Sequence, residues 1–95
     1  MPHFVYILAS RPGGAIYIGR TSNLRRRFEQ HRSGAVPGHT SLYGIRTLVW
    51  FEIHAEFEPS LLRERRLKRW RRAWKDDLIL QCNPQWQDIT HLIPD

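Results

Sequence analysis

Two short runs of aromatic and β-branched residues, separated by a Pro-Gly-Gly turn, constrain this sequence most strongly. The first run reads FVYIL and the second AIYIG, with RPGG between them. Such residues favour strands, and proline followed by glycine permits a tight reversal of the chain. The pattern predicts a β-hairpin with strands at residues 3–9 and 15–19. Tyr6 and Tyr17 would lie on neighbouring strands, and Gly19 would end the second strand at a sharp turn.

The remaining strand pattern predicts a three-stranded sheet. Residues 3–9 are apolar on both faces, which indicates a central strand, whereas the shorter second strand is expected at an edge. The run TLVWFEIH at 47–54 alternates in the manner of a strand. Leu48 and Trp50 are predicted on one of its faces, and Val49 and Phe51 on the other.

A first helix is predicted from Asn23, its N-cap, to Arg32. The side-chain oxygen of an N-cap residue accepts a hydrogen bond from a first-turn amide, and asparagine is among the preferred residues there. Leu24, Phe28 and His31 recur at i, i+4 and i+7, so they share one face of this helix. Arg27 falls on that same face.

A second helix is predicted from the Glu-Pro-Ser segment at 58–60 to about Trp74, because proline is tolerated in a first helical turn. Leu67, Trp70 and Trp74 form its apolar stripe, and Glu64 lies close to its buried side. All four tryptophans of the chain are expected mainly in the core. Trp86 differs from the others because it lies in the irregular tail.

A third, short helix is predicted at residues 76–81, before the turn Asn83-Pro84 and an irregular tail. Residues 33–46 contain three glycines and a proline without periodicity, and are expected to form a surface loop. Together these elements predict an α+β fold, a small three-stranded antiparallel β-sheet flanked by about three α-helices. A chain of 95 residues has apolar surface for one core, so a single domain over residues 1–95 is expected.

The charge distribution indicates a polyanionic partner. Fifteen Lys and Arg against nine Asp and Glu give a net charge of +6, and the basic residues are clustered. Clustered positive charge favours nucleic acid. No apolar run approaches the length of a membrane span, no signal segment is evident, and the single cysteine excludes an internal disulfide. A cytoplasmic protein without membrane contact, monomeric or weakly dimeric, is expected.

The ordered polar residues of the chain resemble the GIY-YIG nuclease superfamily. The residues that carry the resemblance are Tyr6, Tyr17, Gly19, Arg27, His31, Glu64 and Asn83. The similarity covers nearly the whole chain, and it is closest to the small stand-alone bacterial members, which resemble the N-terminal domain of excinuclease C and include the UPF0213 proteins. Phe4 stands where the family name has its first glycine, and the loop Gly38-His39-Thr40 lacks the basic run expected after it.

The resemblance implies a metal-dependent endonuclease that hydrolyses phosphodiester bonds, with a place in DNA repair. Glu64 would hold one divalent cation, Mg²⁺ or Mn²⁺, and Arg27 would bind the scissile phosphate. A tyrosine would activate or position the water, and either Tyr6 or Tyr17 could do so. His31 would act as an alternative base or accept the proton of the tyrosine.

Further residues are expected to contact the phosphate backbone. They are Arg20, Arg25, Arg26, Arg65, Arg69, Arg72 and Asn83. The partner would be nucleic acid, with DNA placed ahead of RNA, and contacts of this kind confer little sequence specificity.

Other functions also fit these residues. A nucleic-acid-binding module of the same fold with little catalysis, or a basic module that docks an acidic protein, would account for the charge. Each site residue also has a structural explanation: Glu64 can pair with Lys68 at i, i+4, Arg27 can be a solvated surface residue, and His31 can interact with the helix dipole. Arg27 together with Glu64 favours the nuclease, because a binding module needs no carboxylate near its basic groove.

Overall fold

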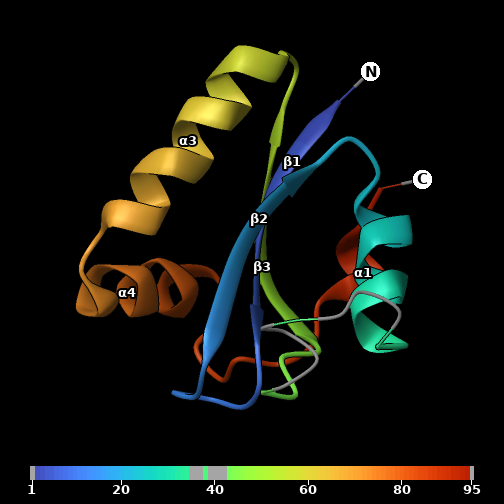
Figure 1. Cartoon of the computed structure of the whole chain (residues 1–95). Coiled ribbons are helices and arrows are strands. Elements are labelled where there is room, and N and C mark those ends of the chain that lie inside the picture. Colours follow the sequence, from blue (N-terminus) through green and yellow to red (C-terminus); the bar gives the residue numbers. More distant parts are fainter. Residues whose placement is uncertain (1, 35–37, 39–42, 95) are drawn as a thin grey trace.

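A three-stranded antiparallel sheet forms the middle layer of the molecule, with helices on both of its faces (Figure 1). The structure is a computed structural model that describes residues 2–34, 38 and 43–94. Its elements are β1 (His3–Ala9), β2 (Ile16–Thr21), α1 (Leu24–Arg32), β3 (Thr47–His54), α3 (Phe57–Arg69), α4 (Arg72–Cys82) and the short 3₁₀ helix η1 (Thr90–Leu92). The predicted α+β class and antiparallel sheet are confirmed.

The strand order is β2-β1-β3, so β1 is central and β2 lies at an edge, as predicted. The predicted hairpin forms, with Phe4 opposite Thr21 and Ala9 opposite Ile16. The second strand was predicted to end at Gly19, but it continues to Thr21. Gly19 therefore lies inside a strand, and its lack of a side chain serves another purpose, described below.

A β-bulge changes the predicted alternation of β3. Ile7 is opposite Trp50, whereas the next residue, Leu8, is opposite Leu48, so the pairing register shifts at this point. An extra residue in one strand reverses the faces of the residues on either side of it. Leu48 and Trp50, predicted on one face, consequently belong to different core clusters. The alternation alone could not reveal the bulge.

The sheet separates two apolar clusters, one under α3 and α4 and the other under α1 (Figure 1). The first contains Val5, Ile7, Ala9, Ile18, Val49, Trp50, Leu67, Ile79 and Trp86. The second contains Phe4, Tyr6, Leu8, Leu24, Phe28, Ile45, Leu48 and Ile93. Helix α1 begins after its predicted N-cap Asn23, whose side chain accepts a hydrogen bond from the amide of Arg26, and it buries the predicted face.

The second and third helices do not divide where the sequence predicted. Trp70 and Arg71 have extended backbone dihedrals, so α3 ends at Arg69 and α4 begins at Arg72. The break turns the chain back toward the sheet, where Ile79 packs in the same cluster as Leu67. Because the break interrupts the predicted apolar stripe, Trp74 lies outside the core with 51% of its surface exposed. The expectation that Trp74 is a core residue was wrong.

The C-terminal tail is fastened to the sheet by Asn83. Its side-chain amide donates to the carbonyl groups of Val49 and Gln87 at 3.1 and 2.7 Å, and its oxygen accepts from the amide of Gln87 at 3.1 Å. This loop holds the backbone of Trp86 at φ 55°, which residues other than glycine rarely adopt, and buries its side chain in the core. Asn83 thus supports the fold, in contrast to its predicted contact with nucleic acid.

Two further expectations concern the middle of the chain and the membrane. The described parts of the predicted loop, residues 33–34, 38 and 43–46, form neither helix nor strand. His39 and Thr40, singled out in the sequence, lie outside the described residues. Within the described ranges, no helix has the length and apolar character needed to cross a lipid bilayer.

We predict that Asn83→Ala destabilises the protein by about 1 to 3 kcal/mol, because it leaves the buried carbonyl of Val49 without its donor. The thermal midpoint should fall by at least about 4 °C in a domain of this size, measured by circular dichroism. Gln81→Ala, on an exposed position of α4, is the matched control and should leave the midpoint unchanged. Equal midpoints for the two variants would contradict the role of Asn83.

Candidate active site

The absence of a side chain at Gly19 brings the hairpin tyrosines together. Gly19 lies opposite Tyr6, and Tyr17 lies opposite Leu8, so both rings are on the α1 side of the sheet. A Cβ atom at Gly19 would lie 2.5 Å from Cζ of Tyr6 and 2.9 Å from Cε2 of Tyr17, and closer still to the hydroxyl oxygen of Tyr6. Any larger residue would displace the Tyr6 hydroxyl, so only glycine fits this position.

Helix α1 brings His31 to the Tyr6 hydroxyl. Nε2 of His31 lies 3.2 Å from that oxygen, within hydrogen-bond distance. Tyr6 is 1% exposed and His31 2%, so this polar pair is buried. The rings of Tyr17 and His31 are 5.3 Å apart between centroids, and Tyr17 itself is only half-buried. The three residues therefore form one cluster, of which Tyr17 is the member that solvent reaches.

Burial keeps the Tyr6–His31 pair neutral. Desolvation by burial raises the pKa of Tyr6, and the nearby Tyr17 adds to the rise. Burial also lowers the pKa of His31 below its ordinary 6.5, and the positive charge of Arg27 lowers it further. At neutral pH the tyrosine therefore keeps its proton, while the imidazole is uncharged and able to accept one.

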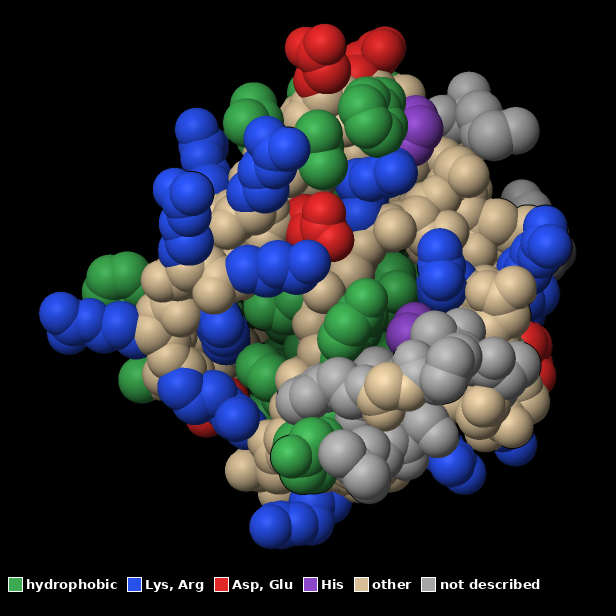
Figure 2. Space-filling view, viewed as in Figure 1, with side chains coloured by type: hydrophobic (Ala, Val, Ile, Leu, Met, Phe, Trp, Pro, Cys, Tyr) green, Lys and Arg blue, Asp and Glu red, His purple; other side chains and the backbone are tan. Residues whose placement is uncertain are grey.

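Two charged residues approach this buried pair from different helices. Arg27 on α1 lowers the pKa of Tyr6 and Glu64 on α3 raises it, so both lie within electrostatic range of the hydroxyl. Because α1 and α3 cover opposite faces of the sheet, their side chains can approach one another at the edge formed by β2 (Figure 1). Figure 2 shows this edge, with basic side chains on both sides of it and apolar and acidic groups between them.

The guanidinium of Arg27 is available to a ligand. Arg27 is half-buried, and no residue in the described ranges forms a hydrogen bond or ion pair with its guanidinium. It borders a polar hollow that is also lined by Thr21, Arg26 and Gln30. Gln30 was not among the predicted site residues, although its spacing of four residues from Arg26 places both on one side of α1. Its two arginines make this hollow suitable for an anion.

Glu64 is the carboxylate that could hold a metal ion. Its side chain is 16% exposed and forms an ion pair with Lys68 at 3.2 Å, while the Lys68 side chain is 52% exposed. The described residues contain no group of three or more His, Cys, Asp or Glu that could together bind a metal. Mg²⁺ fits such a site, because it keeps several waters and binds through one or two carboxylates together with substrate phosphates.

The arginines predicted to bind nucleic acid fall into two groups. Arg20 contacts Nδ1 of His3 at 3.2 Å and lies over the ring of Phe57, and Arg72 donates to Asp76 and to the carbonyl oxygen of Gly14. These side chains are already engaged within the fold. Within the predicted set, Arg26, Arg65 and Arg69 are exposed and form no ion pair with any described residue. The second group is better placed to meet phosphates.

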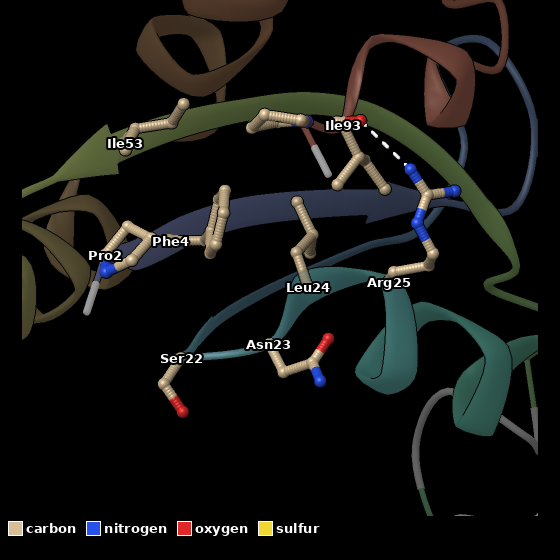
Figure 3. Close-up of a pocket in the computed structure, with 9 residues that line it drawn as sticks. Pro2, Phe4, Ser22, Asn23, Leu24, Arg25, Ile53 and Ile93 are labelled. Atoms are coloured by element: carbon tan, nitrogen blue, oxygen red, sulfur yellow. Dashed lines mark hydrogen bonds between the residues drawn. The ribbon is translucent and has the colours of Figure 1, made fainter.

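Arg25 is directed away from the tyrosine cluster. It donates to the carbonyl oxygen of Ile93 at 3.0 Å, next to an open cavity of about 430 Å³ between β1, α1 and the C-terminal tail (Figure 3). In that view Leu24 points into the cavity toward Phe4. None of the candidate catalytic residues lines it. The apolar lining and the missing catalytic groups separate this cavity from the candidate active site.

Comparisons with known proteins show the family to which the chain belongs. Residues 2–77 match the sequence model of the GIY-YIG catalytic domain, a range that holds every candidate catalytic residue and ends before Asn83. A UPF0213 protein from Aeromonas hydrophila is 30% identical in an alignment 89 positions long that covers 87% of this chain and 65% of that relative. One from Bacillus pumilus is 31% identical, over 94% of this chain and 89% of its own length.

A solved structure is also similar. The solution NMR structure of a UPF0213 protein from Bacillus halodurans covers the whole of both chains with a TM-score of 0.59 and 27% identity. The likeness extends over the sheet and the flanking helices, and therefore includes the elements that carry the candidate site.

We predict that His31 makes stability depend on pH. The unfolded chain protonates this histidine near pH 6.5, whereas the folded state resists protonation, so the unfolded state binds more protons as the pH falls below 6.5. Stability should therefore decline from pH 7.5 to pH 5 in urea unfolding experiments. His31→Gln should show a smaller decline, since the other histidines are common to both proteins. The same decline in both would contradict the burial of a neutral His31.

Proposed function

This chain belongs to the GIY-YIG catalytic domain family, and we propose that it is a metal-dependent endonuclease that hydrolyses phosphodiester bonds in nucleic acid. One observation carries the proposal. The buried hydroxyl of Tyr6 lies 3.2 Å from Nε2 of His31, and the charges of Arg27 and Glu64, on different helices, shift the pKa of Tyr6 in opposite directions. A buried hydroxyl needs one hydrogen-bond partner, but a tyrosine that serves packing alone has no need of charges of both signs near it.

Arg27 is assigned to the scissile phosphate. In phosphodiester hydrolysis a water oxygen attacks phosphorus, and negative charge accumulates on the phosphoryl oxygens. A planar guanidinium binds two such oxygens at once and stays charged at all working pH values. The half-buried position of Arg27, without an ion pair to any described residue, supports this role. The neighbouring polar hollow leaves room for the phosphate.

Glu64 is assigned to a divalent cation, Mg²⁺ or Mn²⁺. When bound, such an ion supplies Lewis-acid stabilisation of the phosphoryl and leaving oxygens. The donor set supports a hard ion, since Glu64 offers carboxylate oxygens and its ion-pair partner Lys68 is half exposed and can turn away. A partly buried carboxylate also keeps its charge close to the tyrosine cluster.

The tyrosines and His31 are assigned to the water. Tyr17 is the solvent-accessible member of the cluster, so its hydroxyl is assigned to orient the attacking water. Tyr6, 1% exposed, cannot contact bulk water, and its hydroxyl is assigned as the hydrogen-bond donor to Nε2 of His31. Hydrolysis releases one proton from the water. The neutral imidazole of His31 is the group able to accept that proton, with a tyrosine hydroxyl passing it on. The bond from phosphorus to the leaving oxygen would break, and a solvent water would donate the proton that this oxygen needs.

The surrounding arginines would hold the rest of the strand. Arg26, Arg65 and Arg69 have no ion pair with any described residue and can bind phosphates. Contacts of this type position a nucleic acid without distinguishing its bases, so low sequence specificity is expected. DNA is the first substrate to test.

A nucleic-acid-binding module without catalysis is the second candidate function. The ion pair between Glu64 and Lys68 favours it, because a carboxylate fully occupied by a lysine would not hold a metal ion. An ordinary i, i+4 pair contributes about 0.3 to 0.5 kcal/mol. The two functions therefore differ in what happens when Glu64 loses its charge.

We predict that the protein cleaves DNA in Mg²⁺ or Mn²⁺ but not in excess chelator, and that Glu64→Gln lowers the rate by about 100-fold or more. Gel-resolved cleavage of single-stranded, duplex and branched DNA measures both effects. Lys68→Gln is the matched control, because it breaks the same ion pair but keeps the carboxylate. If both variants cleave like the wild type, or if the wild type cleaves nothing, the binding module replaces the nuclease.

We predict that Arg27→Ala lowers the cleavage rate by about 100-fold or more, because it removes the group that stabilises charge on the scissile phosphate. Arg26→Ala is the neighbouring control on α1 and should change the rate by no more than a few-fold. Both variants remove one positive charge, so their loss of DNA affinity should be similar in a fluorescence anisotropy titration. Equal cleavage rates for the two would remove Arg27 from the catalytic site.

A further inference from the structure

An exposed tryptophan stands where α3 and α4 meet, and neither the fold nor the proposed catalytic site explains it. Trp74 is 51% exposed, and it lines an open cavity of about 260 Å³ together with Trp70, Asp77, Leu78 and Gln81. Cavities that hold drug-sized ligands begin at about 300 Å³, so this one suits a single planar ring system. On the side of the molecule where α3 and α4 meet, Figure 2 shows hydrophobic groups protruding among basic ones.

The neighbours of Trp74 hold its ring in place. Trp70, partly buried against the core, contacts it edge to face at 6.2 Å between centroids and 85° between planes. Arg63 lies over the ring of Trp70 at 5.3 Å, and Arg71 lies over the ring of Trp74 at 5.4 Å. A ring fixed in this way loses little conformational entropy when a ligand stacks on it. The arrangement is therefore preorganised for stacking.

The charges around Trp74 indicate which ligand it would stack on. Arg65, Arg69 and Arg71 are exposed and form no ion pair with any described residue, so they can receive phosphates. Asp77 would repel a phosphate placed in the cavity itself, which leaves the cavity for an uncharged ring. A planar base attached to a phosphate backbone matches both requirements, and aromatic residues among arginines are typical of single-strand binding.

We propose that Trp74, supported by Trp70 and Arg71, forms a stacking platform for an unpaired nucleobase. Bases inside a duplex present only their edges, so their faces are accessible for stacking only when the base is unpaired. Arg69, the last residue of α3, follows Glu64 by five residues, about 7.5 Å along the helix or about two nucleotides of a strand, and Trp70 comes next in the chain. This proposal rests on the proposed nuclease function. The substrate of the nuclease would be a strand with an unpaired base near the cut.

Binding in chelator tests the platform without catalysis. The probe is a fluorescently labelled oligothymidylate of about 12 nucleotides, compared by anisotropy with a duplex and with an abasic deoxyribose-phosphate oligomer of equal length. Trp74→Ala should weaken oligothymidylate binding by about 5- to 140-fold, the equivalent of about 1 to 3 kcal/mol of stacking. Its affinities for the duplex and the abasic oligomer should remain those of the wild type.

Two further variants separate stacking from a loss of structure. Trp74→Phe keeps an aromatic ring and should retain most of the oligothymidylate affinity, whereas Leu80→Ala removes another exposed apolar residue of α4 and should bind like the wild type. Wild-type binding by Trp74→Ala, or an equal loss toward the abasic oligomer, would overturn the platform. The proposed nuclease would survive that result, since it depends on chelator-sensitive cleavage and on Glu64. Conversely, stacking could persist in a chain that cleaves nothing.

Discussion

The close approach of Gly19 to Tyr6 is the constraint on which the rest of the site depends. The hairpin register sets these residues opposite one another, and the hydroxyl of Tyr6 occupies the space that a side chain at position 19 would fill. That position brings the hydroxyl within 3.2 Å of His31 and within electrostatic range of groups on two helices. A side chain at position 19 would break this set of contacts at its centre.

The candidate site combines a buried neutral pair with charged groups that are less deeply buried. Burial of Tyr6 and His31 disfavours their charged forms, so each satisfies the other by a hydrogen bond. In the part of the chain that the structure describes, every buried side-chain nitrogen and oxygen has a partner. Arg27 and Glu64, in contrast, are partly exposed. Such a division suits phosphodiester chemistry, which needs both proton transfer and charge stabilisation.

The two helices of the site pack on opposite faces of the sheet, each over its own apolar cluster. Helix α1 packs on one cluster and supplies Arg27 and His31, while α3 packs on the other and supplies Glu64 (Figure 1). The break after α3 then returns α4 to the same cluster, at the cost of leaving Trp74 outside it. The irregular feature that sequence periodicity missed is therefore the one that creates the exposed aromatic surface among the arginines.

The sequence by itself determined the sheet and the first helix, because these follow from local patterns, whereas the candidate site residues came from the resemblance of the ordered polar residues to GIY-YIG nucleases. Strand alternation, the Asn23 cap and the i, i+4, i+7 spacing of α1 depend on neighbours in the chain. The tertiary structure alone decided the bulge in β3, the break at Trp70 and Arg71, and the buried position of Asn83. It also decided that Gly19 serves a close approach instead of a strand end. Each of these depends on a contact between residues distant in sequence, where packing outweighs the preference of the local segment.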